Sequence, residues 1–262
     1  MKIIVLIKQV PDSTDVKIDP VTNTLKREGV EAIINPFDMY AIEEGIRIRE
    51  RLGEGEVIVV SMGPPQAEAA IREAISMGCD RGILLSDRKF AGSDTWATSY
   101  TISQAIKKIG DVKIVLCGKQ ASDGDTAQVG PGVSMHIDVP QVTYVKKIEK
   151  ISALSATVER MTEEGYDIVE TPLPALFTVV KEINEPRLPS LKGKIKAKKA
   201  EIPVWTAEDL SCSEDKIGLD GSPTRVVKVF SPEPRGGGRI LEGEPSEAAK
   251  ELAGLLKAVI IG

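Results

Sequence analysis

Four short, unbroken apolar runs in the first half of the chain constrain its fold more than any other feature. They lie at Ile3–Ile7, Val57–Val60, Ile83–Leu85 and Ile114–Cys117. Continuous apolar runs of this length are typical of strands that are covered on both faces. Between them, apolar residues recur with the spacing of amphipathic helices. Strands that alternate with helices predict βαβ crossovers, and therefore an α/β fold with a doubly wound, mostly parallel sheet.

The segment after the fourth run, Gly118–Gly132, reads GKQASDGDTAQVGPG and joins that strand to a predicted helix. Gly118 and Gly124 can take positive φ and let a ligand approach the backbone. The first turn of a helix offers free N–H groups and a positive dipole end, which suit a phosphate. Asp125 and Gln128 have the spacing of a capping box, which would satisfy some of these groups internally. By themselves these residues are compatible with a phosphate site or with an ordinary capped helix.

Several predicted loops meet at one edge of the sheet. In open α/β sheets, ligands bind beyond the carboxyl ends of the strands, where the strand order reverses. The segments expected there, besides the glycine loop Gly118–Gly132, are Lys8–Asp12, Asn35–Asp38, Ser61–Pro65 and Ser86–Phe90. Asn35 is a suitable N-cap, and Pro36 is a suitable first residue of a helix. Neither a GxGxxG after the first strand nor a GxxxxGK[ST] occurs, so any nucleotide is bound by other means.

The composition excludes several classes of protein. A formal net charge of -5 gives no electrostatic reason to expect nucleic acid or an anionic membrane as a partner. Cys79, Cys117 and Cys212 are far apart and His136 is the only histidine, so the chain lacks the usual signatures of disulfides, zinc sites and Cys-ligated clusters. No run of about 18 apolar residues occurs and no signal peptide opens the sequence. We therefore expect no metal site, no membrane span and a cytoplasmic location.

The pattern changes after Pro140 from helical spacing to alternation. Val142–Val145, Ser155–Met161 and Tyr166–Glu170 alternate apolar with polar residues, and a TEEG turn precedes the last of them. These segments predict a β extension of the main sheet. The apolar run Ala175–Val180 is expected to rejoin that sheet.

The chain is predicted to divide into an α/β domain, residues 1–183, and a C-terminal arm, residues 184–262. Six basic residues lie from Arg187 to Lys199 without a carboxylate among them, and the residues that follow are rich in Pro, Gly, Ser and charge. Such a segment is expected to bury little of itself. The chain ends in a predicted helix, Ser246–Ala258, whose apolar face is expected to dock on its own domain or on a partner chain.

Several of these segments, in this order, resemble the β subunit of the electron-transfer flavoproteins. They are KQVPDS at Lys8–Ser13, NPFD at Asn35–Asp38, SMGPP at Ser61–Pro65 and GKQASDGDTAQVGP at Gly118–Pro131. The segment VERMTEEGYDIVETPLPALFT is similar to the family's signature, and NEPRLPSLKGKIKAKK resembles its recognition-loop region. The resemblance covers essentially the whole chain.

The resemblance implies a fold like that of the adenine nucleotide α-hydrolases, and a heterodimer with a larger α subunit that carries the electron-transferring FAD. It also implies that residues 1–183 bind an adenine nucleotide and that the arm docks on the α subunit. Carried over by position, the cofactor contacts would be Leu6, Asn35, Pro36, Phe37, Asp38, Met62, Gly118, Lys119, Gln120, Ala121, Ser122, Asp123, Gly124, Asp125, Thr126, Ala127, Gln128 and Val129. Leu191 would stand at the position that inserts into a partner dehydrogenase.

The nucleotide is structural AMP in one branch of this family and a second FAD in the electron-bifurcating branch. The form DGDTAQVGP resembles the bifurcating branch, so FAD is expected, with AMP as the alternative. In that branch the family implies NADH as hydride donor and ferredoxin or flavodoxin as one electron acceptor. The other electron would go through the α-subunit FAD to an acyl-CoA dehydrogenase-like or membrane-quinone-linked partner.

The chain carries no redox group of its own, so electrons must travel on a bound cofactor and no residue is assigned as catalytic. NADH oxidation at a β-subunit FAD would require the complex with the α subunit. An ATP-binding or nucleotide-hydrolysing α/β protein is the competing class. The missing lysine-bearing phosphate loop and the missing nucleophile-base set argue against it.

Overall fold

The computed structural model describes residues 1–12, 32–228 and 236–260, and the side chains of the last segment up to Lys257. Among these, residues 1–12 and 32–227 belong to one compact unit, and the C-terminal helix belongs to a second. Each unit is described by itself.

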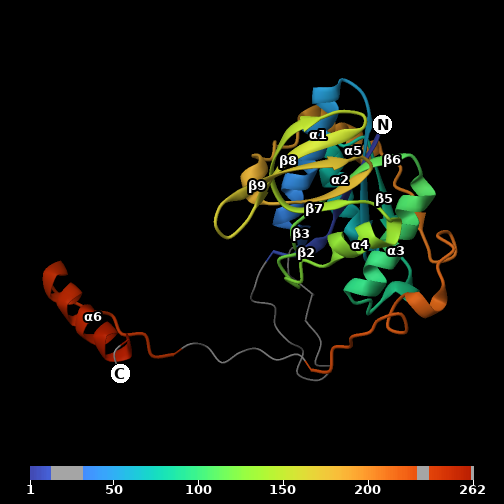
Figure 1. The fold of residues 1–262 in the computed structure, drawn as a ribbon. Coiled ribbons are helices and arrows are strands. Elements are labelled where there is room, and N and C mark those ends of the chain that lie inside the picture. Colours follow the sequence, from blue (N-terminus) through green and yellow to red (C-terminus); the bar gives the residue numbers. More distant parts are fainter. Residues whose placement is uncertain (13–31, 229–235, 261–262) are drawn as a thin grey trace. The chain divides into compact units, whose positions relative to one another are not determined.

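A nine-stranded sheet runs through the first unit (Figure 1). In chain order its strands are β1 (Lys2–Ile7), β4 (Glu56–Met62), β5 (Arg81–Leu85), β6 (Val112–Gly118), β7 (Gln141–Ile151), β8 (Ser155–Met161), β9 (Tyr166–Pro172), β10 (Ala175–Val179) and β11 (Val204–Trp205). They lie in the order β11-β5-β4-β1-β6-β10-β7-β8-β9. Pairing is parallel from β11 to β7 and antiparallel from β7 to β9. The predicted mostly parallel sheet, its β extension and the return of β10 to the sheet are confirmed.

Helices cover both faces of this sheet (Figure 1). They are α1 (Pro36–Leu52), α2 (Glu68–Met77), α3 (Thr95–Ile109), α4 (Val129–Ile137) and α5 (Leu191–Lys199). Short 3-10 helices lie at Pro65–Ala67, Arg88–Phe90, Lys181–Ile183 and Glu214–Lys216, and a separate antiparallel pair is formed by β2 (Gln9–Pro11) and β3 (Ala32–Ile34). The sequence patterns predict the first four helices but not the pair β2-β3.

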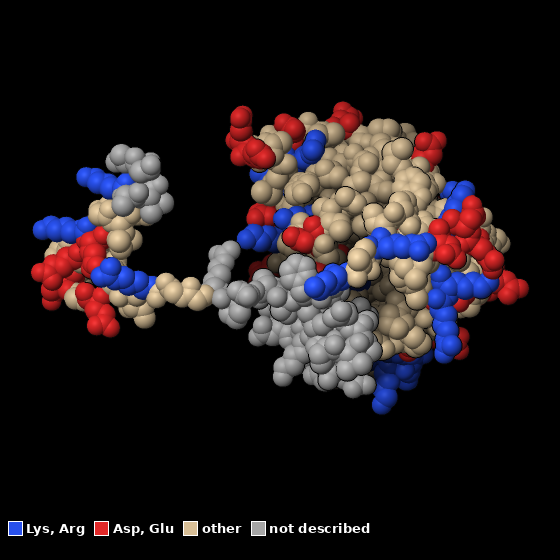
Figure 2. Space-filling model, turned by 90° about the horizontal axis from the view of Figure 1, so that it is seen from below, with Lys and Arg blue, Asp and Glu red and all other residues tan. Residues whose placement is uncertain are grey.

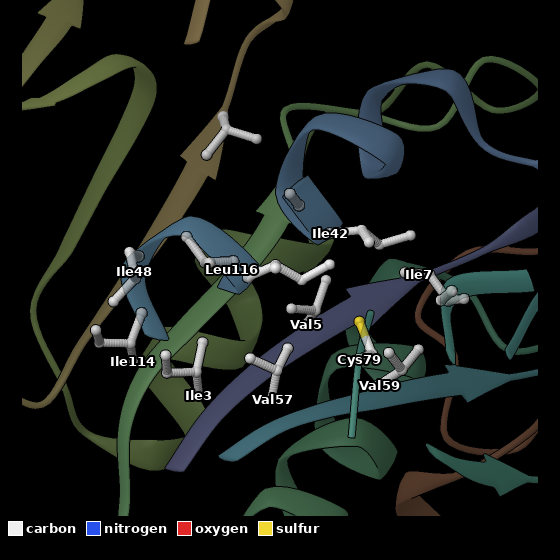
Figure 3. Close-up of a cluster of buried hydrophobic side chains, with 14 of the residues drawn as sticks. Ile3, Val5, Ile7, Ile42, Ile48, Val57, Val59, Cys79, Ile114 and Leu116 are labelled. Carbon is white, nitrogen blue, oxygen red and sulfur yellow. The ribbon is translucent and has the colours of Figure 1, made fainter. Parts of the chain in front are cut away.

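The central strands are apolar throughout because each face of the sheet has its own core. Along β1, Ile3 and Val5 belong to the cluster that includes α1, α2 and α5, whereas Ile4 and Leu6 belong to the cluster that includes α3 and α4. Figure 3 shows part of the first cluster, in which side chains of β1, β4 and β6 meet Ile42 of α1. Successive strand residues point to opposite faces, so only an unbroken apolar run fills both cores.

The predicted start of an arm at residue 184 is wrong for the first unit, which continues to Val227, although most of its residues after 184 are exposed or half-buried. Helix α5 packs on α2, and β11 adds to the edge of the sheet beside β5. The buried apolar residues of this stretch are Ala197, Ala207, Leu210 and Ile217. Single buried residues in short elements leave no periodicity in the sequence, which explains the wrong prediction.

The described part of the second unit contains α6 (Pro245–Ile260), which confirms the predicted C-terminal helix. Its residues Leu252, Leu255 and Leu256 are all exposed. In the described residues, no helix has both the length and the apolar character that a membrane crossing requires.

Candidate functional site

The candidate site lies at the carboxyl edge of the sheet, around the end of β1. This strand lies between β4 and β6, so the strand order reverses there. The carboxyl ends of β1, β4 and β6 bring Lys8, Met62 and Gly118 to this edge, together with the start of α1. The glycine loop follows β6. The sheet topology therefore places the segments that the sequence predicts to bind a nucleotide where open α/β sheets bind ligands.

Asp38 joins three of these segments. Its buried carboxylate accepts hydrogen bonds from the backbone N–H of Lys8 at 2.8 Å and from the backbone N–H of Gly118 at 3.0 Å. Burial raises the pKa of Asp38 to about 7, although both backbone donors act in the opposite direction. This close approach requires a glycine at position 118. A Cβ there would lie 2.7 Å from the Asp38 oxygen and 2.5 Å from Phe37 Cβ.

Asn35 holds the glycine loop rather than capping its own helix. It occupies the N-cap position of α1, but its side chain makes no capping hydrogen bond there. Instead, Nδ2 donates to the carbonyl of Gln120 at 2.9 Å, and Oδ1 accepts from the N–H of Ser122 at 3.0 Å. The predicted N-cap role of its side chain is therefore wrong, while its predicted contact with the cofactor stays a prediction.

The predicted capping box of α4 is also wrong. Helix α4 begins at Val129, with Gln128 at the N-cap position and no side-chain capping bond. The Gln128 amide oxygen accepts from the Thr95 hydroxyl at 3.0 Å, and Asp125 accepts from the side-chain amide of Gln120. The first-turn N–H groups of α4 thus have no side-chain cap, which favours the phosphate interpretation over the ordinary capped helix.

The backbone strain of the glycine loop lies at other residues than expected. Gly118 and Gly124 do not take positive φ, whereas Asp125 and Ala127 both have φ of 54°. Left-handed conformations of residues other than glycine cost about 1 to 3 kcal/mol and cluster at ligand sites. A Cβ at Gly124 would meet nothing within 4 Å, so this exposed part of the loop is open on the side of that residue.

Lys119 is oriented by aromatic rings. Its backbone N–H donates to the carbonyl of Val179 at 2.9 Å, and its Nζ lies 5.0 Å from the centre of the Phe37 ring and 5.7 Å from that of Tyr144. Such cation-π contacts hold an ammonium group near the ring faces. The sequence prediction includes Lys119 and Phe37 but omits Tyr144.

A pocket of about 190 Å³ opens beside these segments. Lys8, Met62 and Asp123 line it together with residues of β2, β3 and the turn after β4, including Gln66. The expected cofactor contacts omit Lys8 and Gln66, although the segment Lys8–Asp12 is expected at this edge of the sheet. Ser13, the last residue of the family-like segment KQVPDS, lies outside the described residues. On the face drawn in Figure 2, acidic and basic side chains are interspersed, and neither sign dominates the described part.

Leu6 and Leu191 are the two remaining predicted residues whose surroundings differ from those of the glycine loop. The Leu6 side chain is buried in the core cluster that includes α3 and α4, so it packs in the core beneath the carboxyl edge of the sheet. Leu191 is the first residue of α5 and is 78% exposed. The expectation of an exposed leucine there is confirmed, but it begins a helix rather than lying on a loop. Arg187, four residues earlier, is not a free basic group, because its guanidinium pairs with Glu43 and Glu50 of α1.

A family model described as the electron transfer flavoprotein domain matches residues 22–210. The chain is 53% identical over 253 residues to the electron transfer flavoprotein subunit beta of Thermoanaerobacterium thermosaccharolyticum, covering 96% of each chain. It is 48% identical to the caffeyl-CoA reductase-Etf complex subunit CarD of Acetobacterium woodii over 98% of each chain. Protein FixA of Sinorhizobium fredii is 48% identical over 90% of this chain and 85% of its own.

These similarities extend over most of the chain, and they include the glycine loop and the segment from Asn35 to Asp38 that holds it. They agree with the α/β fold and with the resemblance noted in the sequence. The chain belongs to the electron transfer flavoprotein family, as a β subunit.

Proposed function

We propose that this chain forms the β subunit of an electron-transferring heterodimer and binds an adenine nucleotide cofactor at the carboxyl edge of β1, β4 and β6. The observation that carries the proposal is the cross-linking of this edge by Asp38 and Asn35, which hold Lys8 and the glycine loop in place. The same arrangement leaves the start of α4 without a side-chain cap. Free backbone N–H groups at a helix start suit the phosphate of a nucleotide, and Lys8 and Lys119 add two positive charges to the segments at this edge.

The proposed cofactor is FAD, with AMP as the alternative. The glycine loop carries the form DGDTAQVGP, and CarD, a relative 48% identical to this chain, is named as a subunit of a caffeyl-CoA reductase-Etf complex. FAD supplies the chemistry of accepting a hydride and passing on single electrons. In this proposal the residues of this chain bind and orient the cofactor and supply no redox group of their own.

The electron route follows from this proposal. NADH would deliver a hydride, which carries two electrons, to the heterodimer. One electron would pass to a low-potential acceptor such as ferredoxin or flavodoxin. The other would pass through the FAD of the α subunit to an acyl-CoA dehydrogenase-like or membrane-quinone-linked partner.

The absorbance spectrum and the nucleotide content of the co-purified heterodimer test this proposal. FAD at the β site requires two flavins per heterodimer, whereas the alternative requires one flavin and one AMP. Acid release followed by chromatography identifies the nucleotide. A heterodimer with one flavin and no adenine nucleotide beyond that flavin would contradict both forms of the proposal.

Gly124→Val should reduce cofactor retention without unfolding the chain. The valine meets no protein atom within 4 Å and φ at this position is not left-handed, so we expect stability within about 0.5 kcal/mol of the wild type. A ligand that lies against the loop would clash with the branched side chain. The measurement is nucleotide content after gel filtration, with Gly165→Val, another turn glycine with open space around it, as the control. Full occupancy in the folded variant would remove Gly124 from the proposed site.

Leu191→Ala should slow electron delivery to the partner dehydrogenase while leaving flavin content and melting temperature unchanged. Leu191 is exposed between Pro189 and Lys192, as expected of an apolar anchor with a basic rim. Truncating such an anchor costs about 2 kcal/mol or more of binding, which is about thirtyfold in affinity. Leu154→Ala is the matched control, because Leu154 is 77% exposed on the β extension. An unaltered partner titration for Leu191→Ala would exclude this docking role.

A further inference from the structure

An ion pair spans the proposed nucleotide pocket. The Nζ of Lys8, just after β1, lies 2.6 and 2.7 Å from the two carboxylate oxygens of Asp123 in the glycine loop. Both residues line the pocket of about 190 Å³. A polar contact lies on another side of the same pocket, where the side-chain amide of Gln9 donates to the carbonyl of Gln66 after β4 at 3.3 Å.

The pocket of about 190 Å³ is smaller than most ligand sites. Sites for small molecules and cofactors are typically about 300 to 1,000 Å³. Lys8 and Asp123 both line this pocket, so a nucleotide phosphate that enters it meets their ion pair.

This pair is inexpensive to open. The side chains of Lys8 and Asp123 are 48% and 31% exposed, and ion pairs of such exposure contribute about 1 kcal/mol or less. The backbone of Lys8 is fixed, because its N–H donates to Asp38 and its carbonyl accepts from the N–H of Asn35 at 2.8 Å. Asp123 lies on the exposed tip of the loop. Opening therefore requires movement of the two side chains and the loop tip, while the position of the lysine stem is preserved.

We propose that Lys8 is a phosphate-binding residue whose site Asp123 occupies when no nucleotide is bound, so that the nucleotide phosphate displaces the Asp123 carboxylate. This inference rests on the proposed nucleotide site. The Asp123 carboxylate and the nucleotide phosphate are both anions that accept charge-assisted hydrogen bonds from an ammonium group. The phosphate can therefore take the place of the carboxylate on Lys8. Without the exchange, the phosphate would meet the negative charge of Asp123 at the pocket mouth.

The test compares AMP with adenosine as probes on the full-length chain freed of nucleotide, by calorimetry. AMP is suitable because both FAD and AMP contain adenosine 5′-phosphate. Lys8→Met should weaken AMP binding about tenfold and leave adenosine binding unchanged, since only the phosphate contact is lost. Asp123→Asn should strengthen AMP binding severalfold, because the competing charge is removed. In the double variant, the gain from Asp123→Asn should be smaller than in the wild type, because the competition for Lys8 is gone and only the direct repulsion between Asp123 and the phosphate is removed.

Two results would overturn the inference. One is an unchanged ratio of AMP to adenosine affinity in folded Lys8→Met, and the other is weaker AMP binding in Asp123→Asn. In either case the wild type still binds AMP, so the proposed nucleotide site survives. A wild type that binds neither probe would instead remove the proposed site and this inference with it. Asp123 lies on an exposed loop, so Asp123→Asn is expected to fold. Its AMP affinity therefore still tests the inference if Lys8→Met does not fold.

Discussion

Replacing Arg187 with alanine should lower the free energy of unfolding by about 2 to 3 kcal/mol. Arg187 donates to Glu43 through its backbone N–H, Nε and Nη2, and to Glu50 through both terminal nitrogens, at 2.7 to 3.1 Å. Glu43 is almost fully buried, with 2% of its side chain exposed. The alanine variant leaves this carboxylate with Arg47 alone as its charged partner.

The expected loss lies below the roughly 3 to 5 kcal/mol of a fully buried pair that loses one partner. Arg47 remains 2.6 Å from Glu43, and a third of the Arg187 side chain is exposed to solvent. The remaining Arg47 and the access of solvent both reduce the cost of leaving the Glu43 carboxylate without Arg187. Arg187→Lys should lose about half as much, because an ammonium cannot reproduce the forked contacts with two carboxylates.

The stabilisation by the Arg187-Glu43 contacts should depend on pH. Burial alone would raise the pKa of Glu43, but hydrogen bonds from Arg187 and Arg47 outweigh it and hold the pKa below its ordinary value of 4.5. The stabilisation is therefore present above pH 4.5 and is lost as the pH falls through the lowered pKa. The difference between wild type and Arg187→Ala should be constant near neutrality and shrink in acid.

Urea unfolding of the two variants, with Lys194→Ala as a control, measures the effect. Lys194 is a basic residue of the same segment, and no ion pair links it to another described residue. Its replacement should change stability by less than about 0.5 kcal/mol. Equal stability of Arg187→Ala and Lys194→Ala would show that the contacts with Glu43 and Glu50 do not anchor this segment to α1.

Asp38→Asn should destabilise the chain by about 2 to 4 kcal/mol and release the cofactor. The carboxylate offers one oxygen to the N–H of Lys8 and the other to the N–H of Gly118. Asparagine has nearly the same shape but only one oxygen, so its amide group would face one of these buried N–H donors. Each buried donor left without a partner costs about 1 to 3 kcal/mol, and the donor-donor contact adds to it.

This residue also predicts a pH effect that the Asn variant should lack. Burial raises the pKa of Asp38 to about 7, from an ordinary value of 3.8. Between these values the folded chain retains a proton that the unfolded chain has released, so the stability of the wild type should fall as the pH rises from about 4 to about 7. The stability of the Asp38→Asn variant should not show this decrease between about pH 4 and about pH 7, because asparagine does not titrate.

Thermal unfolding at several pH values, together with nucleotide content, checks both effects. Asp123→Asn makes the same chemical change on an exposed loop of the same site, and it should leave the melting temperature within about 2 °C of the wild type. An Asp38→Asn variant as stable as Asp123→Asn would mean that the junction of β1, β6 and α1 does not depend on this carboxylate.

The sequence by itself determined the sheet and the place of the candidate site. The apolar runs predict β1, β4, β5 and β6 because a strand buried on both faces leaves a continuous local signal. The glycine loop after β6 and the segment at Asn35–Asp38 are recognisable for the same reason, since a turn, a proline and a helix start act over a few residues. Their joint location follows from the parallel order of the strands.

Only the tertiary structure decided which partners the polar side chains take. Asn35 and Asp38 resemble residues of a helix start. They nevertheless bind backbone groups of Lys8, about 30 residues away, and of the glycine loop, 80 or more residues away. Gln128 and Asp125 have the spacing of a capping box but bind other side chains. A side chain with several possible partners takes those that packing brings within reach, and distance along the chain carries no information about that choice.

The same limit explains the chain after residue 184. Helix α5 carries five lysines and buries only Ala197, so its apolar pattern is too weak to predict packing. It lies against α2 because Gly193 has no side chain there, where a Cβ would lie 1.9 Å from the carbonyl oxygen of Ser76. Arg187 likewise belongs to a basic segment in the sequence, but in the structure it pairs with the buried Glu43 and the exposed Glu50. Burial is a property of the assembled fold, so the sequence showed the charge of this segment and only the tertiary structure showed where that charge is neutralised.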